Sequence, residues 1–177
     1  AARRRRSAAL LSVGTGIGGA LLLDGRIVRG VHGSAGAFGW LNFDYRCVPD
    51  PDHGFLERMA SGSALAGRAQ QLEPPLTSYE LIAQARAGHP PCLNIVREVG
   101  HLLGLACASI ASLFDPEVLL FTGGLSEAFD LFEPVMREQL QRYGAPGVRT
   151  IPLLRAQLGS EAAAYGALRA AERPRSL

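Results

Sequence analysis

A glycine-rich turn near the start of the chain constrains the fold more than any other feature. Residues 8–13 form an apolar run typical of a buried strand, and they lead directly into residues 14–19, Gly-Thr-Gly-Ile-Gly-Gly. A second apolar run follows, and Asp24-Gly25 separates it from a third. Asp-Gly between apolar runs favours a two-residue hairpin, because both central residues of a type I′ turn need a positive φ. The chain is therefore predicted to open with a β-meander.

The sequence argues against three common kinds of site at this turn and indicates a fourth. A dinucleotide-binding fingerprint must open a helix, whereas residues 20–23 continue as a strand. A Walker P-loop and Schiff-base chemistry both need lysine, and the sequence contains none. Glycines between two strands can instead direct successive backbone N–H groups at an anion, with the Thr15 hydroxyl as a further donor. We interpret the turn as a phosphate-binding loop; a purely structural turn is the alternative, although that would account for two glycines rather than four.

A second glycine turn follows a second buried strand. Residues 117–122 are almost continuously apolar, as in a strand buried on both faces of a sheet, and Gly123-Gly124 ends the run. Glycines here would let a flat base lie against the backbone, and a packing turn is the alternative. Two glycine turns at strand ends of one domain favour a single nucleotide site.

The remaining segments predict helices around a sheet, and hence one α/β domain. Apolar spacing predicts a helix over residues 55–71, and Thr77 with Glu80 forms a capping box for a short helix after it. Residues 92–114 are apolar on nearly every face, as in a central buried helix. The pattern ends with a helix over 130–143 that has Pro134 in its first turn, a strand over 148–154 and an Ala-rich helix over 162–172.

Composition limits the classes of protein that remain. A chain of 177 residues, 47% hydrophobic and 19% charged, can bury a core and is too apolar for a disordered protein. The net charge is +2 and basic residues cluster only at positions 3–6, so we do not expect nucleic acid as a partner. Three cysteines without CxxC spacing can build neither a disulfide framework nor a four-cysteine zinc site, so we expect a reduced, cytoplasmic protein. The apolar run 102–114 is shorter than the roughly 20 residues of a membrane span, so we expect no membrane segment.

Several segments, in order along nearly the whole chain, resemble the ROK family of bacterial sugar kinases and sugar-sensing repressors. They are residues 11–36, residues 54–57 (Gly-Phe-Leu-Glu), residues 114–126 and residues 161–167 (Glu-Ala-Ala-Ala-Tyr-Gly-Ala). The resemblance implies the actin-like, ribonuclease-H-like ATPase fold, whose two lobes hold ATP and a hexose between them. Residues 1–177 resemble the C-terminal lobe alone. The family's Asp-x-Gly-Gly-Thr motif and its catalytic Asp belong to the N-terminal lobe, and no segment of this sequence matches them.

The resemblance implies roles for particular residues. The residues that match the family's second phosphate motif are Gly14, Thr15, Gly16 and Gly18. The residues that match its adenosine-side motif are Gly123, Gly124 and Leu125. Glu57 matches a glutamate that contacts the sugar, whereas the residues alone also allow an acid that stabilises the positive end of a helix.

Two motifs depart from the family pattern. Residues 36–40 are Gly-Ala-Phe-Gly-Trp, whereas the family has Gly-Glu-Ile-Gly-His at this place. In the family, the Glu contacts the sugar, and the His contacts the sugar and binds zinc. The family's zinc loop, Cys-x-Cys-Gly-x-x-Gly-Cys-Leu-Glu, retains only Gly54, Leu56 and Glu57. We therefore expect the zinc site to be lost. Phe38 and Trp40 could form an apolar wall for a substrate other than a free hexose.

The function expected from this resemblance is glucokinase-like transfer of a phosphoryl group from ATP to a sugar. This chain would supply the nucleotide-binding lobe without the catalytic base, and Mg²⁺ would enter with the ATP. The alternative is a non-catalytic sugar-sensing transcriptional regulator or scaffold, favoured by the residues at positions 37 and 40. The expected partner is a nucleotide; a sugar and a second copy of the chain, in a homodimer, are open alternatives.

Overall fold

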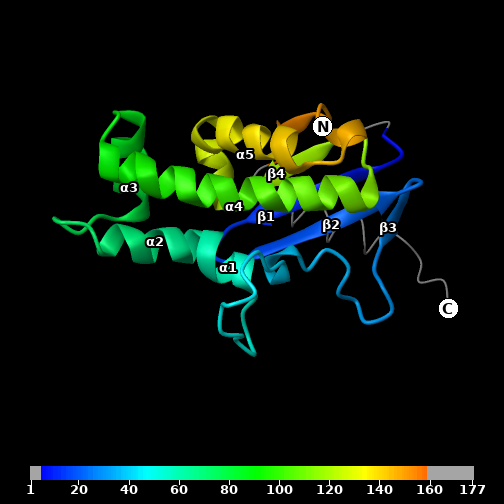
Figure 1. The fold of residues 1–177 in the computed structure, drawn as a ribbon, viewed down its shortest axis with the longest axis horizontal. Coiled ribbons are helices and arrows are strands. Elements are labelled where there is room, and N and C mark those ends of the chain that lie inside the picture. Colours follow the sequence, from blue (N-terminus) through cyan, green and yellow to red (C-terminus); the bar gives the residue numbers. More distant parts are fainter. Residues whose placement is uncertain (1–4, 159–177) are drawn as a thin grey trace.

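A mixed five-stranded sheet is the centre of the fold in the computed structural model, which describes residues 5–158 (Figure 1). The strand order is β3-β2-β1-β4-β5, with antiparallel pairs β1/β2 and β2/β3 and parallel pairs β1/β4 and β4/β5. The strands are β1 (Ala8–Val13), β2 (Ile17–Leu23), β3 (Arg26–Val28), β4 (Leu119–Thr122) and β5 (Leu153–Arg155). This confirms the predicted α/β class and the opening meander. The helix expected over 162–172 and the family-like residues 161–167 lie outside the described residues.

The hairpin between β2 and β3 forms as its sequence predicts. Asp24 has φ 49° and Gly25 has φ 76°, so both central residues adopt the positive φ that a type I′ turn needs. Side chains alternate across the sheet, as they do along any strand. In β1, Leu11 and Val13 join the main core, whereas Ala8 and Leu10 belong to a small second cluster.

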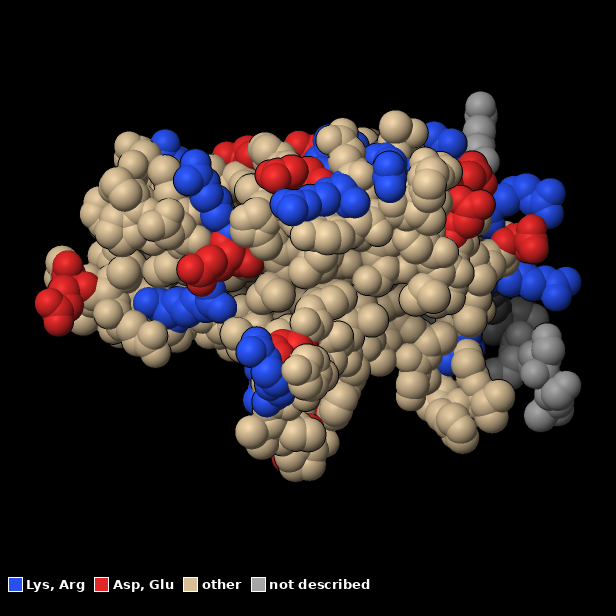
Figure 2. Space-filling model, in the orientation of Figure 1, with Lys and Arg blue, Asp and Glu red and all other residues tan. Residues whose placement is uncertain are grey.

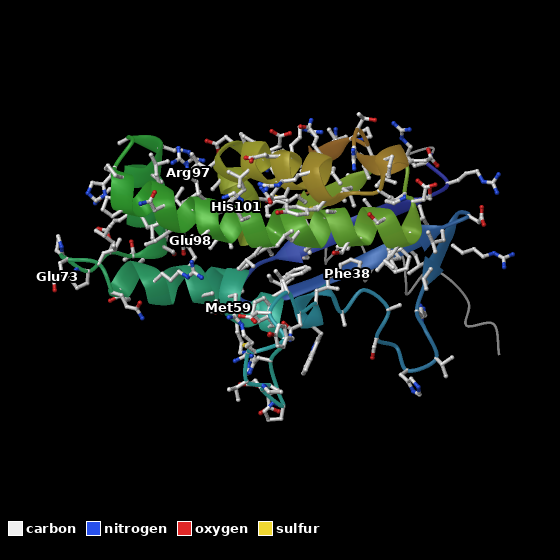
Figure 3. All side chains as sticks on the ribbon, in the orientation of Figure 1. Phe38, Met59, Glu73, Arg97, Glu98 and His101 are labelled. Carbon is white, nitrogen blue, oxygen red and sulfur yellow. The ribbon has the colours of Figure 1, made fainter. Side chains whose placement is uncertain are left out.

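Two long helices, α4 (Pro90–Phe114) and α5 (Phe129–Tyr143), lie side by side over the sheet (Figure 1). They approach closely at Gly104, where a Cβ would lie 2.7 Å from the Cβ of Gln139. Pro134 is the sixth residue of α5, and not in its first turn as predicted, because the 3-10 turn η2 (Gly124–Ala128) ends at residue 128. In Figure 3, Arg97, Glu98 and His101 mark the exposed side of α4.

α4 is long and apolar enough to cross a membrane by length and composition. The expectation from the sequence considered residues 102–114 alone, whereas the helix begins at Pro90. Its most apolar stretch is 56% buried within the protein, and α4 packs against β1 and against α1, α2, α3 and α5. In this fold α4 therefore has the surroundings of a core helix, as the sequence predicts for residues 92–114.

The helix predicted over residues 55–71 is two helices, α1 (Phe55–Ala60) and α2 (Gly62–Gln70). Ser61, between them, is extended, and its hydroxyl accepts a hydrogen bond from the N–H of Ala64, which caps α2. α3 (Ser78–Arg86) begins with the predicted capping box of Thr77 and Glu80.

The last predicted strand begins later than expected. Residues 146–148 form a 3-10 turn, η3 (Pro146–Val148), and β5 starts at Leu153, where it pairs with β4. A further 3-10 turn, η1 (Phe38–Trp40), precedes α1. Basic and acidic side chains are interspersed on the face of the molecule shown in Figure 2.

Candidate functional site

The first glycine turn, residues 14–18, connects β1 to β2 and lies against the start of α2. The N–H of Gly62 donates to the carbonyl oxygen of Gly14 (2.7 Å), and the N–H of Ser63 donates to that of Thr15 (3.4 Å). Among the described residues, no hydrogen bond uses the N–H of Thr15, the N–H of Gly16 or the Thr15 hydroxyl. The turn is thus held from behind through its carbonyl groups, and it keeps three donors for a ligand.

Glu57 lies against the same turn. Its Oε2 accepts a hydrogen bond from the N–H of Ile17 at 2.7 Å, although the two residues are 40 positions apart. A Cβ on Gly16 would lie 2.3 Å from that oxygen, so the absence of a side chain at position 16 makes room for the carboxylate. Glu57 is in the first turn of α1, but its carboxylate reaches the glycine turn rather than serving only the helix end.

The second glycine turn, residues 123–125, follows β4 at the same end of the sheet. β4 is the parallel neighbour of β1, with Thr122 opposite Ser12. The first turn begins two residues after Ser12 and the second begins one residue after Thr122, so the two turns lie close together. Gly123 has φ 91°, and a Cβ there would lie 2.4 Å from the carbonyl oxygen of Val13. A Cβ on Gly124, in contrast, would meet no other group within 4 Å. The two glycines differ accordingly: Gly123 is required by the backbone, whereas Gly124 borders a cavity.

Two open cavities meet at the first glycine turn. The first cavity, of about 560 Å³, is lined by residues of both glycine turns, of α2 and α3, and of the 3-10 turn η2. The second cavity, of about 500 Å³, is lined by Thr15, Gly16, His53, Glu57, Arg58, Ser61, Ser63 and Ala64. Thr15 and Ser63 line both. Of the residues predicted for the phosphate and adenosine motifs, Gly14, Thr15, Gly124 and Leu125 line the first cavity, Gly16 lines the second, and Gly18 and Gly123 line neither.

One wall of the first cavity is the face of α3 that carries Tyr79, Ile82, Ala83 and Arg86. These positions follow the i, i+3, i+4, i+7 spacing of one helix face, a signal that was present in the sequence but was not used to predict a site. Arg86 closes the wall: its guanidinium pairs with both carboxylate oxygens of Asp130 (2.7 and 3.0 Å) and donates to the carbonyl oxygen of Glu127 (2.8 Å). The hydrogen bonds with Arg86 lower the pKa of Asp130, so this pair stays charged and links α3 to α5.

An imidazole and a guanidinium group, from two residues that were not predicted for a site, also line the second cavity. His53 lines it from the loop before α1, with its Nδ1 3.5 Å from Asp50 Oδ1. The pKa of Asp50 is lowered by hydrogen bonds from the backbone N–H groups of Asp52 and His53. Arg58, which follows Glu57, is the other.

The expected apolar wall of Phe38 and Trp40 is not present at these cavities. Phe38 is 6% exposed and belongs to the core, where it occupies the space that Gly19 leaves open. Trp40 is 55% exposed, and neither residue lines either cavity. Phe38 therefore packs in the core, whereas its position in the altered motif had suggested contact with a substrate.

A structural zinc ion does not fit the residues near Glu57. Within residues 5–158, no group of three or more His, Cys, Asp or Glu side chains is placed to hold a metal. Cys47 lies in the relevant loop, but its Sγ is 3.2 Å from Nη2 of Arg58, a cation that would oppose a metal ion. The described residues thus lack the four ligands that structural zinc needs.

The sheet order and its flanking helices define the class of the fold as an actin-like ATPase lobe, the fold of the ROK sugar kinases. The sequence profile of the ROK family matches residues 1–173, and the chain belongs to this family.

Three relatives show the range of proteins that this chain is similar to. A glucokinase of Streptomyces coelicolor is 31% identical over 195 residues, which cover 96% of this chain and 60% of the relative. The crystal structure of a ROK family glucokinase from Streptomyces griseus in complex with glucose and AMPPNP is 27% identical, with a TM-score of 0.82, and the match covers 96% of this chain and 62% of that one. The xylose repressor of Bacillus subtilis is 27% identical, over 94% of this chain and 44% of the repressor. The chain thus spans about 60% of the length of the glucokinases.

Proposed function

We propose that this chain is the nucleotide-binding lobe of an ATP-dependent, glucokinase-like sugar kinase. The observation that carries the proposal is the meeting of two cavities at Thr15, on a turn with unused backbone donors. Phosphoryl transfer needs a donor and an acceptor on either side of one phosphate group, and a shared cradle between two cavities supplies that arrangement.

The first cavity suits the nucleotide. The N–H groups of Thr15 and Gly16 and the Thr15 hydroxyl would bind phosphate oxygens, because an anion is favoured where several donors converge. The base and ribose would lie between Gly124-Leu125 and the apolar positions of α3, such as Ile82. The relative from Streptomyces griseus was crystallised with AMPPNP, which supports this assignment.

The second cavity suits the acceptor sugar. The carboxylate of Glu57 is fixed by the N–H of Ile17 and still lines the cavity, so its remaining lone pairs could accept from sugar hydroxyls. Ser61 and Ser63 border the same space. The base that removes the hydroxyl proton would come from a part of the protein that these residues do not include.

Mg²⁺ would enter with the phosphates rather than occupy a site of its own. Residues 5–158 offer no cluster of three carboxylate, imidazole or thiol ligands. Mg²⁺ commonly binds through substrate phosphates, water and one or two carboxylates, so the absence of such a cluster is compatible with it. When bound, the ion would neutralise charge on the transferred phosphoryl group.

Calorimetry of the chain with Mg·AMPPNP tests the nucleotide assignment. Thr15→Ala should weaken binding by about tenfold, because a hydrogen bond to a charged group is lost. Gly124→Val should abolish binding, since its side chain would extend into the open space of the first cavity. Gly67→Val is the matched control, because Gly67 also has open space but lines neither cavity. Equal affinity in Gly124→Val and Gly67→Val would contradict the proposal.

The second candidate is a sugar-sensing transcriptional regulator that has no kinase activity. The match to the xylose repressor favours it, as do Ala37 and Trp40 in place of the two polar residues of the family motif. A regulator of this kind would bind xylose or glucose in calorimetry without any nucleotide, and would not bind Mg·AMPPNP. Nucleotide binding that Gly124→Val abolishes would exclude this candidate.

A further inference from the structure

The 42–54 loop, which projects from the fold just before α1, has few connections to the rest of the molecule (Figure 1). At its base, the N–H of Leu56 donates to the carbonyl oxygen of Leu41 (3.1 Å), and the rings of Phe43 and Phe55 meet edge to face at 6.4 Å. Beyond this base, the hydrogen bonds of residues 44–53 are local, apart from those described next.

One side chain outside the loop reaches its far part. Nη2 of Arg58 donates to the carbonyl oxygen of Val48 at 2.9 Å and lies 3.2 Å from Sγ of Cys47. Nε of Arg58 is fully buried and has no hydrogen-bond partner among the described atoms, so the guanidinium is held within the contact rather than extended into solvent. The hydrogen bonds that connect residues 44–53 to α1 therefore all come from Arg58.

The position of Arg58 couples this loop to the second cavity. Arg58 directly follows Glu57 in α1, and His53 lies at the end of the loop, so all three line that cavity. If the loop moved relative to α1, His53 would move relative to Glu57. The guanidinium beside Cys47 also disfavours a metal ion at that sulfur, because two cations would repel each other.

We infer that Arg58 is a positioning residue: it fastens the 42–54 loop to α1 and thereby sets the position of His53 relative to Glu57 in the second cavity. That His53 and Glu57 face a sugar in this cavity rests on the proposed function, whereas the fastening of the loop does not. The inference therefore needs a measurement that does not depend on a bound ligand.

Hydrogen exchange of the chain, measured by mass spectrometry, provides that measurement. In Arg58→Met, amides of residues 44–53 should exchange about tenfold faster, because the variant loses a charge-assisted hydrogen bond to Val48. Amides of α4 should be unchanged, which separates a local effect from loss of global stability. Arg58→Lys should recover much of the protection, since an ammonium group can still donate to that carbonyl oxygen.

Arg46→Met is the matched control, because Arg46 lies in the same loop and pairs only with Asp44 among the described residues. It should leave exchange across residues 47–53 unchanged, and the NMR signals of the His53 ring should shift in Arg58→Met but not in Arg46→Met. Unchanged exchange in Arg58→Met, an equal rise in α4, or no recovery in Arg58→Lys would each overturn the inference. Loss of nucleotide binding alone would contradict the proposed function and leave these results unaffected.

Discussion

Replacing Gly16 with alanine should destabilise the fold, because the new side chain would collide with the carboxylate of Glu57. The new Cβ would lie 2.3 Å from Oε2 and 3.0 Å from Cδ of Glu57, so the side chain must leave its place and its hydrogen bond from Ile17 is lost. A hydrogen bond to a charged group contributes about 1.5–3 kcal/mol. Alanine reduces the entropy of the unfolded chain, which offsets about 0.4–1 kcal/mol of that loss. We therefore expect a net destabilisation of about 1–2 kcal/mol.

Thermal and urea unfolding of a double-mutant cycle measure this effect. For a chain of this size, each kcal/mol lowers Tm by about 2–4 °C, so Gly16→Ala should lower it by several degrees. Gly18→Ala is the control, because a Cβ on Gly18 would meet no other group within 4 Å, so this change should not lower Tm. On a Glu57→Ala background, Gly16→Ala should cost nothing and should gain about 0.4–1 kcal/mol, because its clashing partner is gone and only the entropy effect remains. An equal cost on both backgrounds would refute the reasoning.

Three further predictions follow from packing and charge. Gly104→Ala should destabilise the fold by about 1–3 kcal/mol in urea unfolding, because its Cβ would overlap Gln139 across the contact of α4 and α5. The thiol of Cys107 should not react with Ellman's reagent at pH 8 until the chain unfolds, because burial raises its pKa to about 12; labelling of the native chain at Cys107 would contradict this. The pKa of Glu117 is lowered from 4.5 mainly by a hydrogen bond from the N–H of Ser7, so its stabilising effect is complete above pH 4.5 and is lost as pH falls through the lowered value. The stability difference between wild type and Glu117→Gln should therefore shrink in acid, and a difference independent of pH would contradict this.

The parts of the fold that were predicted from sequence are those governed by local chemistry. The β2–β3 hairpin depends on the conformational freedom of Asp24-Gly25, and the start of α3 depends on the pairing of Thr77 with Glu80. Both signals act between residues a few positions apart, so a single sequence contains them. The α/β class followed from the strand and helix patterns, and the actin-like fold followed from the resemblance to the ROK family, which the family match confirms.

The errors arose where distant contacts override local pattern. The apolar spacing continues through Ser61, but the chain bends there because the N–H groups of Gly62 and Ser63 bind the carbonyl groups of the first glycine turn. Phe38 reads as part of a site, yet it packs into the core because Gly19, on the neighbouring strand, leaves room for its ring. His53 lines a cavity through the course of its loop, which no periodicity in the sequence could indicate.

We propose that the first glycine turn holds the phosphates of a nucleotide between two cavities. Amide chemical shifts of the ¹⁵N-labelled chain, followed during a titration with Mg·ADP, test it most directly. The largest shifts should occur at Thr15, Gly16 and Gly124, with smaller ones along the cavity face of α3 and none in β3. Shifts confined to other parts of the chain, or the same shifts in Gly124→Val as in wild type, would contradict it.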